Sequence, residues 1–184
     1  MKKIKSLFKR DYDGNRKVYN EIVPGCEWVA HGEGVATRKF NGTPCAIING
    51  KFYKRYDVKD KAVPVGAIPC QKEPDIETGH FPHWIEIVDN KENKWFMEGY
   101  YNLMNCGFAL NDTYELCGPK INGNPEKFEN HFLVPHGCEQ LVDCPRIFWD
   151  IKEYLKDKDI EGIVWHRENG DMVKIKKKDF DYSK

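Results

Sequence analysis

A lysine beside a glycine-containing turn is the first feature of this sequence that could do chemistry. Lys39 stands just before Asn41-Gly42, and an apolar stretch follows. A lysine amine acts as a nucleophile only when it is uncharged, and neighbouring cations or apolar surroundings both favour that form. Gly42 has no side chain and would let the backbone pass close to a ligand. Lys39 is therefore a candidate covalent nucleophile, although an exposed lysine beside an ordinary turn gives the same spacing.

Two more lysines near the end of the chain alternate with apolar residues, in the run Val173-Lys174-Ile175-Lys176. Residues two apart in a strand share a face, so both ammonium groups could meet one phosphate. They would favour the uncharged form of a neighbouring lysine and stabilise charge that develops on phosphate oxygens. The alternative is that Lys174 and Lys176 cover the solvated face of an edge strand.

Strands must position these lysines, because strand patterns are more numerous than helical patterns in the sequence. Short β-branched and aromatic runs bounded by turn residues predict three antiparallel hairpins: 44–49 with 51–57, 84–88 with 94–99, and 162–166 with 172–176. Asn49-Gly50 joins the first pair, and this dipeptide favours the type I′ turn of a two-residue hairpin. Further short strands are predicted at 113–117 and 132–134.

Helical patterns are fewer. One helix is predicted over 145–157, with Pro145 in its first turn and Asp143 as its cap. Its apolar stripe consists of Ile147, Phe148, Ile151 and Leu155. Weaker helical patterns cover 15–22 and 99–110. The sum predicts an α+β fold built on antiparallel sheet, in a single domain over 1–184 with residues 1–32 as an N-terminal extension packed on it.

Composition excludes several classes of protein. Of the 184 residues, 40% are hydrophobic, which is enough for a core, and no apolar run is long enough to cross a membrane. Lys plus Arg and Asp plus Glu both number 29, so the net charge of zero excludes a globally basic nucleic-acid binder.

The cysteines indicate a compartment. The seven cysteines include no C-x-x-C pair, and the N-terminus lacks the apolar stretch of a secretory signal. We therefore expect reduced thiols in a cytoplasmic, intracellular protein. His80-Phe81-Pro82-His83 could supply two zinc ligands, but an ordinary turn is the better interpretation because no second pair of ligands matches it.

The segment from Lys39 to Thr43 resembles motif I of the covalent nucleotidyltransferases, the superfamily of ATP-dependent DNA and RNA ligases and mRNA capping enzymes. The usual motif is Lys-x-Asp-Gly-Thr/Ser, and Asn41 takes the place of its aspartate. The segments that resemble the superfamily's later motifs follow in the expected order: Lys54-Arg55-Tyr56-Asp57, Tyr114-Glu115-Leu116-Cys117-Gly118, His131-Phe132-Leu133-Val134-Pro135-His136, Glu161-Gly162-Ile163-Val164 and Val173-Lys174-Ile175-Lys176.

A narrower resemblance is to the small 5′-to-3′ RNA ligase family known from vertebrates and some viruses. The segments that carry it are Gly79-His80-Phe81-Pro82-His83-Trp84, Ile121-Asn122-Gly123-Asn124-Pro125, Leu133-Val134-Pro135-His136-Gly137 and Ile160-Glu161-Gly162-Ile163-Val164-Trp165-His166. The resemblance implies an antiparallel-sheet nucleotidyltransferase (adenylyltransferase) domain of the ATP-grasp-like ligase and capping-enzyme type. We expect no oligonucleotide-binding (OB-fold) domain, because the sequence ends eight residues after Lys176.

The resemblance also implies a reaction and roles for residues. Lys39 would attack the α-phosphate of ATP, AMP would pass to an RNA 5′-phosphate, and a 3′-hydroxyl would then expel AMP. Lys174 and Lys176 would assist as catalytic residues. Nucleotide contacts are expected from Arg38, Arg55, Glu115, His136 and Glu161, and ligands for Mg²⁺ or Mn²⁺ from Glu161 and Glu115. The partner would be RNA with 5′-phosphate and 3′-hydroxyl ends. The enzyme would be a monomer that does not associate with a membrane.

Some assignments stay open at the level of sequence. Leu133, Pro135 and His136 are alternatives for the residue that stacks on adenine, with the tryptophans at 84, 95 and 165 as further candidates. Arg55 could instead form a cross-strand salt bridge, and Glu98 is either a second metal ligand or a surface residue. An mRNA-capping guanylyltransferase is a less favoured alternative. A degenerate nucleotide- or RNA-binding protein without activity is the alternative from another class, supported only by Asn41.

Overall fold

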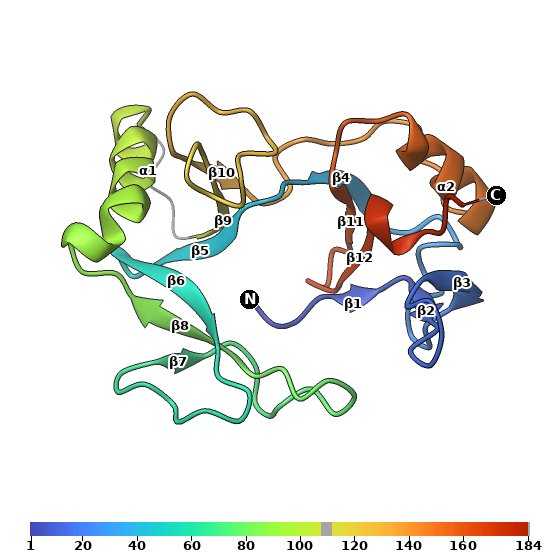
Figure 1. Ribbon diagram of the computed structural model, residues 1–184, viewed down its shortest axis with the longest axis horizontal. Helices are drawn as coiled ribbons and strands as arrows, with labels where there is room; N and C mark the ends of the chain where they lie inside the picture. The colour runs from blue at the N-terminus through green and yellow to red at the C-terminus, as the bar shows by residue number, and fades with distance from the viewer. Residues whose placement is uncertain (108–111, 184) are drawn as a thin grey trace. The chain divides into compact units, whose positions relative to one another are not determined.

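A computed structural model describes residues 1–107 and 112–183, which form two compact units. The first unit combines Met1–Lys3 with Asn41–His136, and the second combines Ile4–Phe40 with Gly137–Lys184. Both contain antiparallel sheet, and each of them also contains an α-helix (Figure 1). The predicted α+β class is confirmed. The single domain predicted over 1–184 stays a prediction, and the two units are described in turn.

The first unit is built on a six-stranded antiparallel sheet with the strand order β10-β9-β5-β6-β8-β7. Its strands are β5 (Thr43–Ile48), β6 (Lys51–Asp57), β7 (Ile68–Pro69), β8 (Pro82–Glu86), β9 (Asp112–Cys117) and β10 (Phe132–Pro135). The hairpin predicted around Asn49-Gly50 is confirmed. Asn49 and Gly50 have φ angles of 50° and 74°, the pair of positive values that a type I′ turn requires.

The second predicted hairpin is wrong, because residues 94–99 are helical. A short 3-10 turn (Lys91–Asn93) leads into α1 (Lys94–Asn105), while β8 pairs with β6 and β7. The physical reason is the spacing of Phe96, Met97, Tyr100 and Leu103, which places them on one helical face against the sheet. The helix predicted over 99–110 therefore exists but begins earlier, and residues 108–110 lie outside the described residues.

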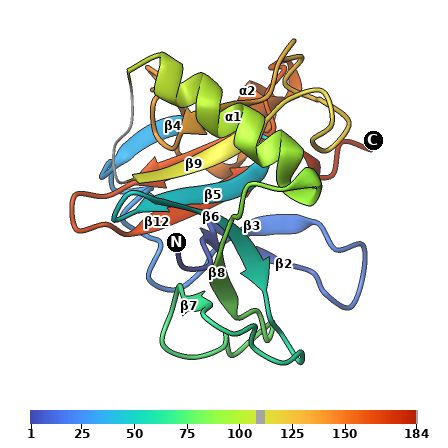
Figure 2. The same ribbon diagram turned by 90° about the vertical axis from the view of Figure 1, so that its left-hand side faces the viewer.

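The two faces of this sheet have different environments. The face that α1 covers carries the larger core, whose members include Cys45, Tyr114, Leu116 and Leu133 (Figure 2). The opposite face carries a smaller cluster of Ala46, Tyr53 and Trp84. Side chains alternate between the faces along each strand, so a residue's position in its strand decides which environment it meets.

The second unit contains a four-stranded sheet of order β1-β12-β11-β4 and a separate hairpin. The sheet consists of β1 (Lys5–Ser6), β4 (Val35–Lys39), β11 (Gly162–His166) and β12 (Met172–Lys176), and the hairpin of β2 (Phe8–Arg10) and β3 (Val18–Ile22). β1 is parallel to β12, and the other pairs in the sheet are antiparallel. The third predicted hairpin is confirmed with its predicted bounds. The helix predicted at 15–22 is wrong, because β3 lies there.

The helix of the second unit, α2 (Phe148–Lys156), begins later than predicted. Ile147 is its N-cap residue and no side chain caps it, so the cap assigned to Asp143 is wrong. Asp143 has a φ of 55°, a left-handed conformation, and lies four residues before the N-cap. Phe148, Ile151 and Leu155 are buried as predicted, whereas the side chain of Ile147 is 63% exposed. Within the described residues, no helix has the length and apolarity to cross a membrane.

Candidate active site

One face of the second unit's sheet carries the three predicted catalytic lysines. Lys39 on β4 and Lys176 on β12 both stand opposite Gly162 on β11, and Lys174 stands opposite Val164. The apolar residues between them face the other way into the core, including Ala36, Ile163, Trp165, Val173 and Ile175. Strand alternation therefore places Lys39, Lys174 and Lys176 on the face opposite the core, as the sequence predicts for the pair on β12.

Glu161 brings two of these lysines together. Its Oε2 lies 2.5 Å from the Nζ of Lys39, and its Oε1 lies 2.8 Å from the Nζ of Lys176. The Lys39 ammonium also donates to the carbonyl of Phe40 at 3.3 Å. The Glu161 side chain is only 11% exposed, so these contacts are shielded from water. A buried carboxylate between two ammonium groups is a charge-assisted arrangement with both oxygens occupied.

The pKa of Glu161 reflects this position. Burial of the carboxylate acts to raise its pKa, but the charges of Lys39 and Lys176 and their hydrogen bonds outweigh burial. The pKa of Glu161 therefore lies below its ordinary value, and the group is ionised at neutral pH. The site holds one negative charge between two positive charges, which leaves it attractive to an anion such as phosphate.

Gly162 explains how the lysines come so close. It lies in the middle of the sheet between Lys39 and Lys176. A Cβ atom there would lie 2.1 Å from the carbonyl oxygen of Ile175, so no larger residue fits this backbone. The glycine that follows Glu161 is thus a structural requirement of the site. The sequence alone predicted no physical role for it.

Arg38 lies apart from this face. It stands on the alternate face of β4, opposite Ile163, and its guanidinium forms an ion pair with Glu139 at 3.3 Å. The same guanidinium lies over the ring of Phe40 at 4.6 Å. The structure therefore does not bring Arg38 together with Lys39, and its predicted nucleotide contact has no support from this geometry.

The first unit carries a second group of predicted site residues on the sheet face opposite α1. Glu115 on β9 stands between Pro44 on β5 and Val134 on β10. Pro44 shares its face with Ala46, whose partner Tyr53 shares its face with Arg55. Glu115 and Arg55 therefore occupy one face of the sheet, with one strand, β5, between theirs, as a shared nucleotide-binding role requires.

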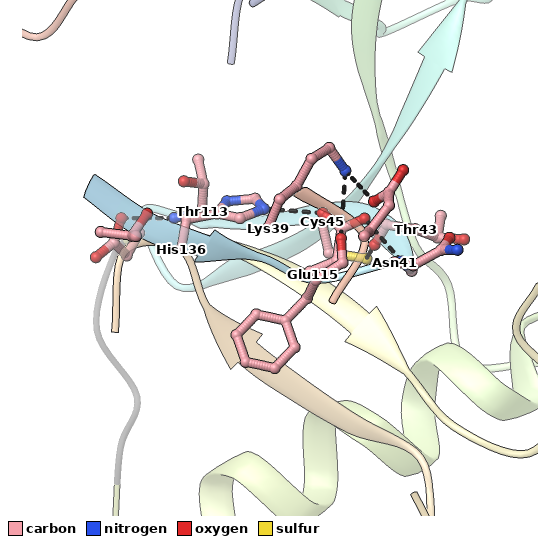
Figure 3. Close-up of polar contacts among 12 residues, drawn as sticks. Lys39, Asn41, Thr43, Cys45, Thr113, Glu115 and His136 are labelled. Carbon is pink, nitrogen blue, oxygen red and sulfur yellow. Dashed lines mark hydrogen bonds and ion pairs between the residues drawn. The ribbon is translucent and has the colours of Figure 1, made fainter. Parts of the chain in front are cut away.

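Glu115 is fixed by two partners. Its Oε1 accepts a hydrogen bond from the backbone N–H of Gly42 at 3.1 Å, and its Oε2 lies 2.9 Å from Nε2 of His136 (Figure 3). The backbone N–H of His136 donates to the carbonyl of Thr113 at 3.1 Å, which holds the imidazole at the end of β10. Glu115 is only 6% exposed. The structure thus joins Glu115, His136 and the Asn41-Gly42 turn.

Arg55 is half-buried without an acid partner. Burial lowers the pKa of its guanidinium from the ordinary value, the change expected when a cation leaves water. Asp57 is engaged by the imidazole of His80 and by the backbone N–H of Phe81 at 2.9 Å. The described residues provide no ion pair for Arg55, so the cross-strand salt bridge considered as an alternative is not formed. Its donors suit an oxygen-rich ligand.

The candidates for adenine stacking separate clearly. Leu133, Trp84 and Trp165 are core residues, at most 4% exposed. Trp95 stacks on His131, with ring centroids 4.7 Å apart. Val134, which the sequence did not single out, shares the face of Glu115 and is followed by Pro135 and His136. Glu98 accepts the backbone N–H of His131 at 3.1 Å, so its observed contacts are structural.

The turn after Lys39 is held by two residues for which the sequence predicted no role. The amide of Asn122 donates to Oδ1 of Asn41 at 3.1 Å and to the carbonyl of Gly42 at 2.9 Å. Glu126 accepts the backbone N–H of Asn41 at 2.7 Å. In the sequence, the Asn-Gly-Asn-Pro run indicated this loop only through its resemblance to a family of RNA ligases. It did not predict these contacts.

The carboxylates of the two units suit a divalent ion that takes most of its ligands from phosphate and water. No three His, Cys, Asp or Glu side chains gather around one point within residues 1–107 and 112–183. Mg²⁺ is commonly held by one or two carboxylates, with phosphate oxygens and waters as its remaining ligands. Glu161 or Glu115 could supply such a carboxylate. The imidazole of His80 contacts Asp57, and that of His83 contacts the carbonyl of Phe81. All seven cysteines are free thiols.

Comparisons with known proteins agree on one family. The family model described as RNA ligase 1 matches residues 102–183. RNA ligase 1 of Mus musculus is 39% identical over a region that covers 77% of this chain and 65% of the relative. The Rattus norvegicus protein of that name is 30% identical with the same coverage, and the Pongo abelii protein is 30% identical over 68% of this chain and 50% of the relative. This chain thus spans between half and two thirds of these relatives.

Proposed function

Because this chain belongs to the RNA ligase family, we propose that it is an ATP-dependent RNA ligase that carries AMP on Lys39. The observation that carries the proposal is the Lys39–Glu161–Lys176 cluster, which joins three motifs from distant parts of the sequence on neighbouring strands. Its cationic, water-shielded face suits the negative oxygens of a triphosphate. The fold proposed for the chain is correspondingly that of a nucleotidyltransferase.

The first step is attack of Lys39 on ATP. The Lys39 ammonium first gives up one proton to water. Its Nζ then forms a bond to the α-phosphorus, the bond to the pyrophosphate oxygen breaks, and the nitrogen releases a second proton to water. Lys39 must exchange its contact with Glu161 for the phosphate, since the carboxylate stabilises the charged amine. Lys176 and Lys174 lie on the same face and stabilise the charge on the phosphate oxygens during this transfer.

The second step takes place at the same phosphorus, and the third takes place at the phosphorus of the RNA 5′-phosphate. An oxygen of an RNA 5′-phosphate displaces Lys39 and takes the AMP, and an RNA 3′-hydroxyl then attacks that 5′-phosphate and releases AMP. A divalent ion would neutralise phosphate charge when bound. In the first unit, Glu115 accepts hydrogen bonds from ribose hydroxyls, His136 holds that carboxylate, and Arg55 donates to a phosphate or ribose oxygen.

Self-adenylylation tests this proposal. Incubation with ATP and Mg²⁺ or Mn²⁺ should raise the intact mass of the protein by one AMP, and the adduct should survive denaturation. Lys39→Ala removes the nucleophile and should abolish the increase, while Lys54→Ala, a lysine in the first unit bound to Asn93, serves as the control. Modification that persists in Lys39→Ala would show that the nucleophile is another residue.

The choice of nucleotide separates the alternative functions. Labelled ATP, CTP and GTP should be offered in parallel, followed by denaturing electrophoresis. Labelling by ATP supports the ligase, and labelling by GTP would support a capping guanylyltransferase. A folded protein that binds nucleotide without labelling would support a degenerate binding protein.

A further inference from the structure

The loop between β9 and β10 carries a motif that the proposed reaction does not use. Its residues Asn122, Gly123, Asn124 and Lys127 all have positive φ angles, between 49° and 77°. Asparagine and glycine tolerate this left-handed region better than other residues, which explains the Asn-Gly-Asn run. Asn124 locks the loop on itself, because its side chain accepts the N–H of Phe128 and donates to that residue's carbonyl, both at 3.0 Å.

The locked loop presents two side chains to the turn that follows Lys39. Asn122 binds the side chain of Asn41 and the carbonyl of Gly42, while Glu126 binds the N–H of Asn41. The opposite side of the Gly42 residue is also occupied, since its N–H donates to Glu115. Gly42 allows this close packing because a Cβ atom there would lie 2.1 Å from the carbonyl oxygen of Leu116.

We propose that Asn122 and Glu126 are positioning residues that clamp the Asn41-Gly42 turn and so orient Glu115. This inference rests on the proposed ligase function, in which Glu115 binds nucleotide and Lys39 accepts AMP. Asn122 donates to the carbonyl of Gly42, and Glu115 accepts a hydrogen bond from the N–H of the same residue. A change at Asn122 therefore reaches Glu115 through one residue, without contact between Asn122 and the nucleotide.

The clamp also explains why Asn41 is compatible with activity. Motif I usually has aspartate here, and the role of the side chain in this turn is to accept a hydrogen bond from Asn122. An amide oxygen fills that role, and it adds no charge beside Glu126 and Glu115. The departure from the usual motif is thus matched by the Asn-Gly-Asn loop opposite it.

The test compares two matched asparagines. Asn122→Asp and Asn124→Asp both suit a left-handed backbone, but only the first removes the donor to Asn41 and Gly42. Asn122→Asp should slow single-turnover adenylylation by roughly tenfold or more, since it breaks two hydrogen bonds and sets a carboxylate against two oxygens. Asn124→Asp keeps the acceptor for Phe128 but loses the donor to its carbonyl; it leaves both contacts of Asn122 in place and should therefore slow adenylylation less than Asn122→Asp. Equal rates in the two variants would overturn the clamp.

A rescue experiment separates position from charge at Glu126. Glu126→Ala should lose roughly tenfold in adenylylation rate, and Glu126→Gln should recover most of it because an amide oxygen still accepts the N–H of Asn41. Glu129→Gln, an exposed glutamate of the same loop, is the control. Glutamine no better than alanine would contradict the proposal. The Asn41→Ala and Asn122→Asp changes should also be non-additive, since they share one contact.

Amide hydrogen exchange distinguishes failure of the clamp from failure of the ligase function. The Gly42 amide should exchange faster in Asn122→Asp than in Asn124→Asp, and the Asn41 amide faster in Glu126→Ala than in Glu126→Gln. These measurements need no ATP. A wild-type protein that takes up no AMP would refute the proposed function, and unchanged exchange at Asn41 and Gly42 would refute the clamp in either case.

Discussion

At the scale of residues, Glu161 is the centre of the candidate site. It accepts one contact from Lys39 and one from Lys176, and its side chain is only 11% exposed. A carboxylate buried without such partners would be protonated or would destabilise the fold by several kcal/mol, on the order of the cost of an uncompensated buried charge. The lysines and Glu161 therefore depend on each other, and removal of one changes the charge state that the others can sustain.

The depressed pKa of Glu161 predicts how stability responds to acid. The folded state binds fewer protons than the unfolded state around the ordinary value of 4.5, so the contribution of Glu161 is fully present above that pH. It is lost as the pH falls through the lower folded pKa. Wild type should therefore lose more stability than Glu161→Gln between about pH 6 and about pH 3.5, measured as urea midpoints.

A glutamate without this environment is the control for the acid measurement. Glu153 is 66% exposed, and its carboxylate lies 3.6 Å from Lys156 on the surface of α2. Surface pairs of this kind contribute little, so Glu153→Gln should follow wild type across the same pH range. Parallel acid curves for wild type and Glu161→Gln would contradict the coupling of Glu161 to the two lysines.

At the scale of elements, sequence patterns predicted the strands that carry the site but not the start of each helix. Residues 162–166 and 172–176 were found with their bounds, because two buried residues alternate with Lys174 and Lys176 on a defined strand. Residues 94–99 were assigned to a strand, since a short aromatic and apolar run fits both patterns. Only the continuation through Tyr100 and Leu103 shows the helical period.

The contacts of the candidate site were predictable to different degrees. Alternation along β12 placed Lys174 and Lys176 on one face, because a period of two is a property of the strand itself. The clamp of Asn122 on the Asn41-Gly42 turn was not predicted, since it joins side chains 81 residues apart in the sequence through loop geometry. Arg38 shows the same limit, because its position beside Lys39 in the sequence places it on the opposite face.

The beginning of α2 gives a prediction at this scale. Ile151 is fully buried, and Ile147 precedes the helix with its side chain 63% exposed. Ile151→Ala should lower the free energy of unfolding by about 2–5 kcal/mol, the usual cost of emptying a packed core site. Ile147→Ala should change it by less than about 0.5 kcal/mol. Equal losses in urea denaturation would support the earlier start of the helix that the sequence suggested.

At the scale of the whole molecule, a net charge of zero limits how this chain could hold the proposed RNA substrate. Phosphate neutralisation by lysine and arginine supplies most of the affinity of non-specific nucleic-acid binding, so an electrically balanced protein depends on a local cluster. Several N-terminal lysines are already engaged. Lys3 pairs with Asp75 at 2.7 Å, and Lys9 pairs with Glu21. The N-terminal cations available to RNA are therefore fewer than the sequence suggests.

Lys178 is the exposed lysine that the structure favours for RNA. It follows the end of β12, close in sequence to Lys176. Lys5 on β1 pairs with Val173 and therefore stands on the face of the sheet opposite Lys174 and Lys176. Lys177 is less suited, because its ammonium donates to the carbonyl of Lys158 at 2.9 Å. The Lys178→Ala variant should weaken joining of RNA ends and leave self-adenylylation nearly unchanged, since Lys178 does not contact Glu161.

The salt dependence of RNA binding gives the sharper measurement for Lys178. Loss of one phosphate contact on a single strand should reduce the slope of log affinity against log salt by about 0.7. Lys156→Ala is the control, because this exposed lysine lies beside Glu153 on α2. An unchanged slope, or equal losses in adenylylation and joining, would place the RNA elsewhere on the protein. A weaker slope with intact adenylylation would show that Lys178 acts after the nucleotide step, where the RNA end is held.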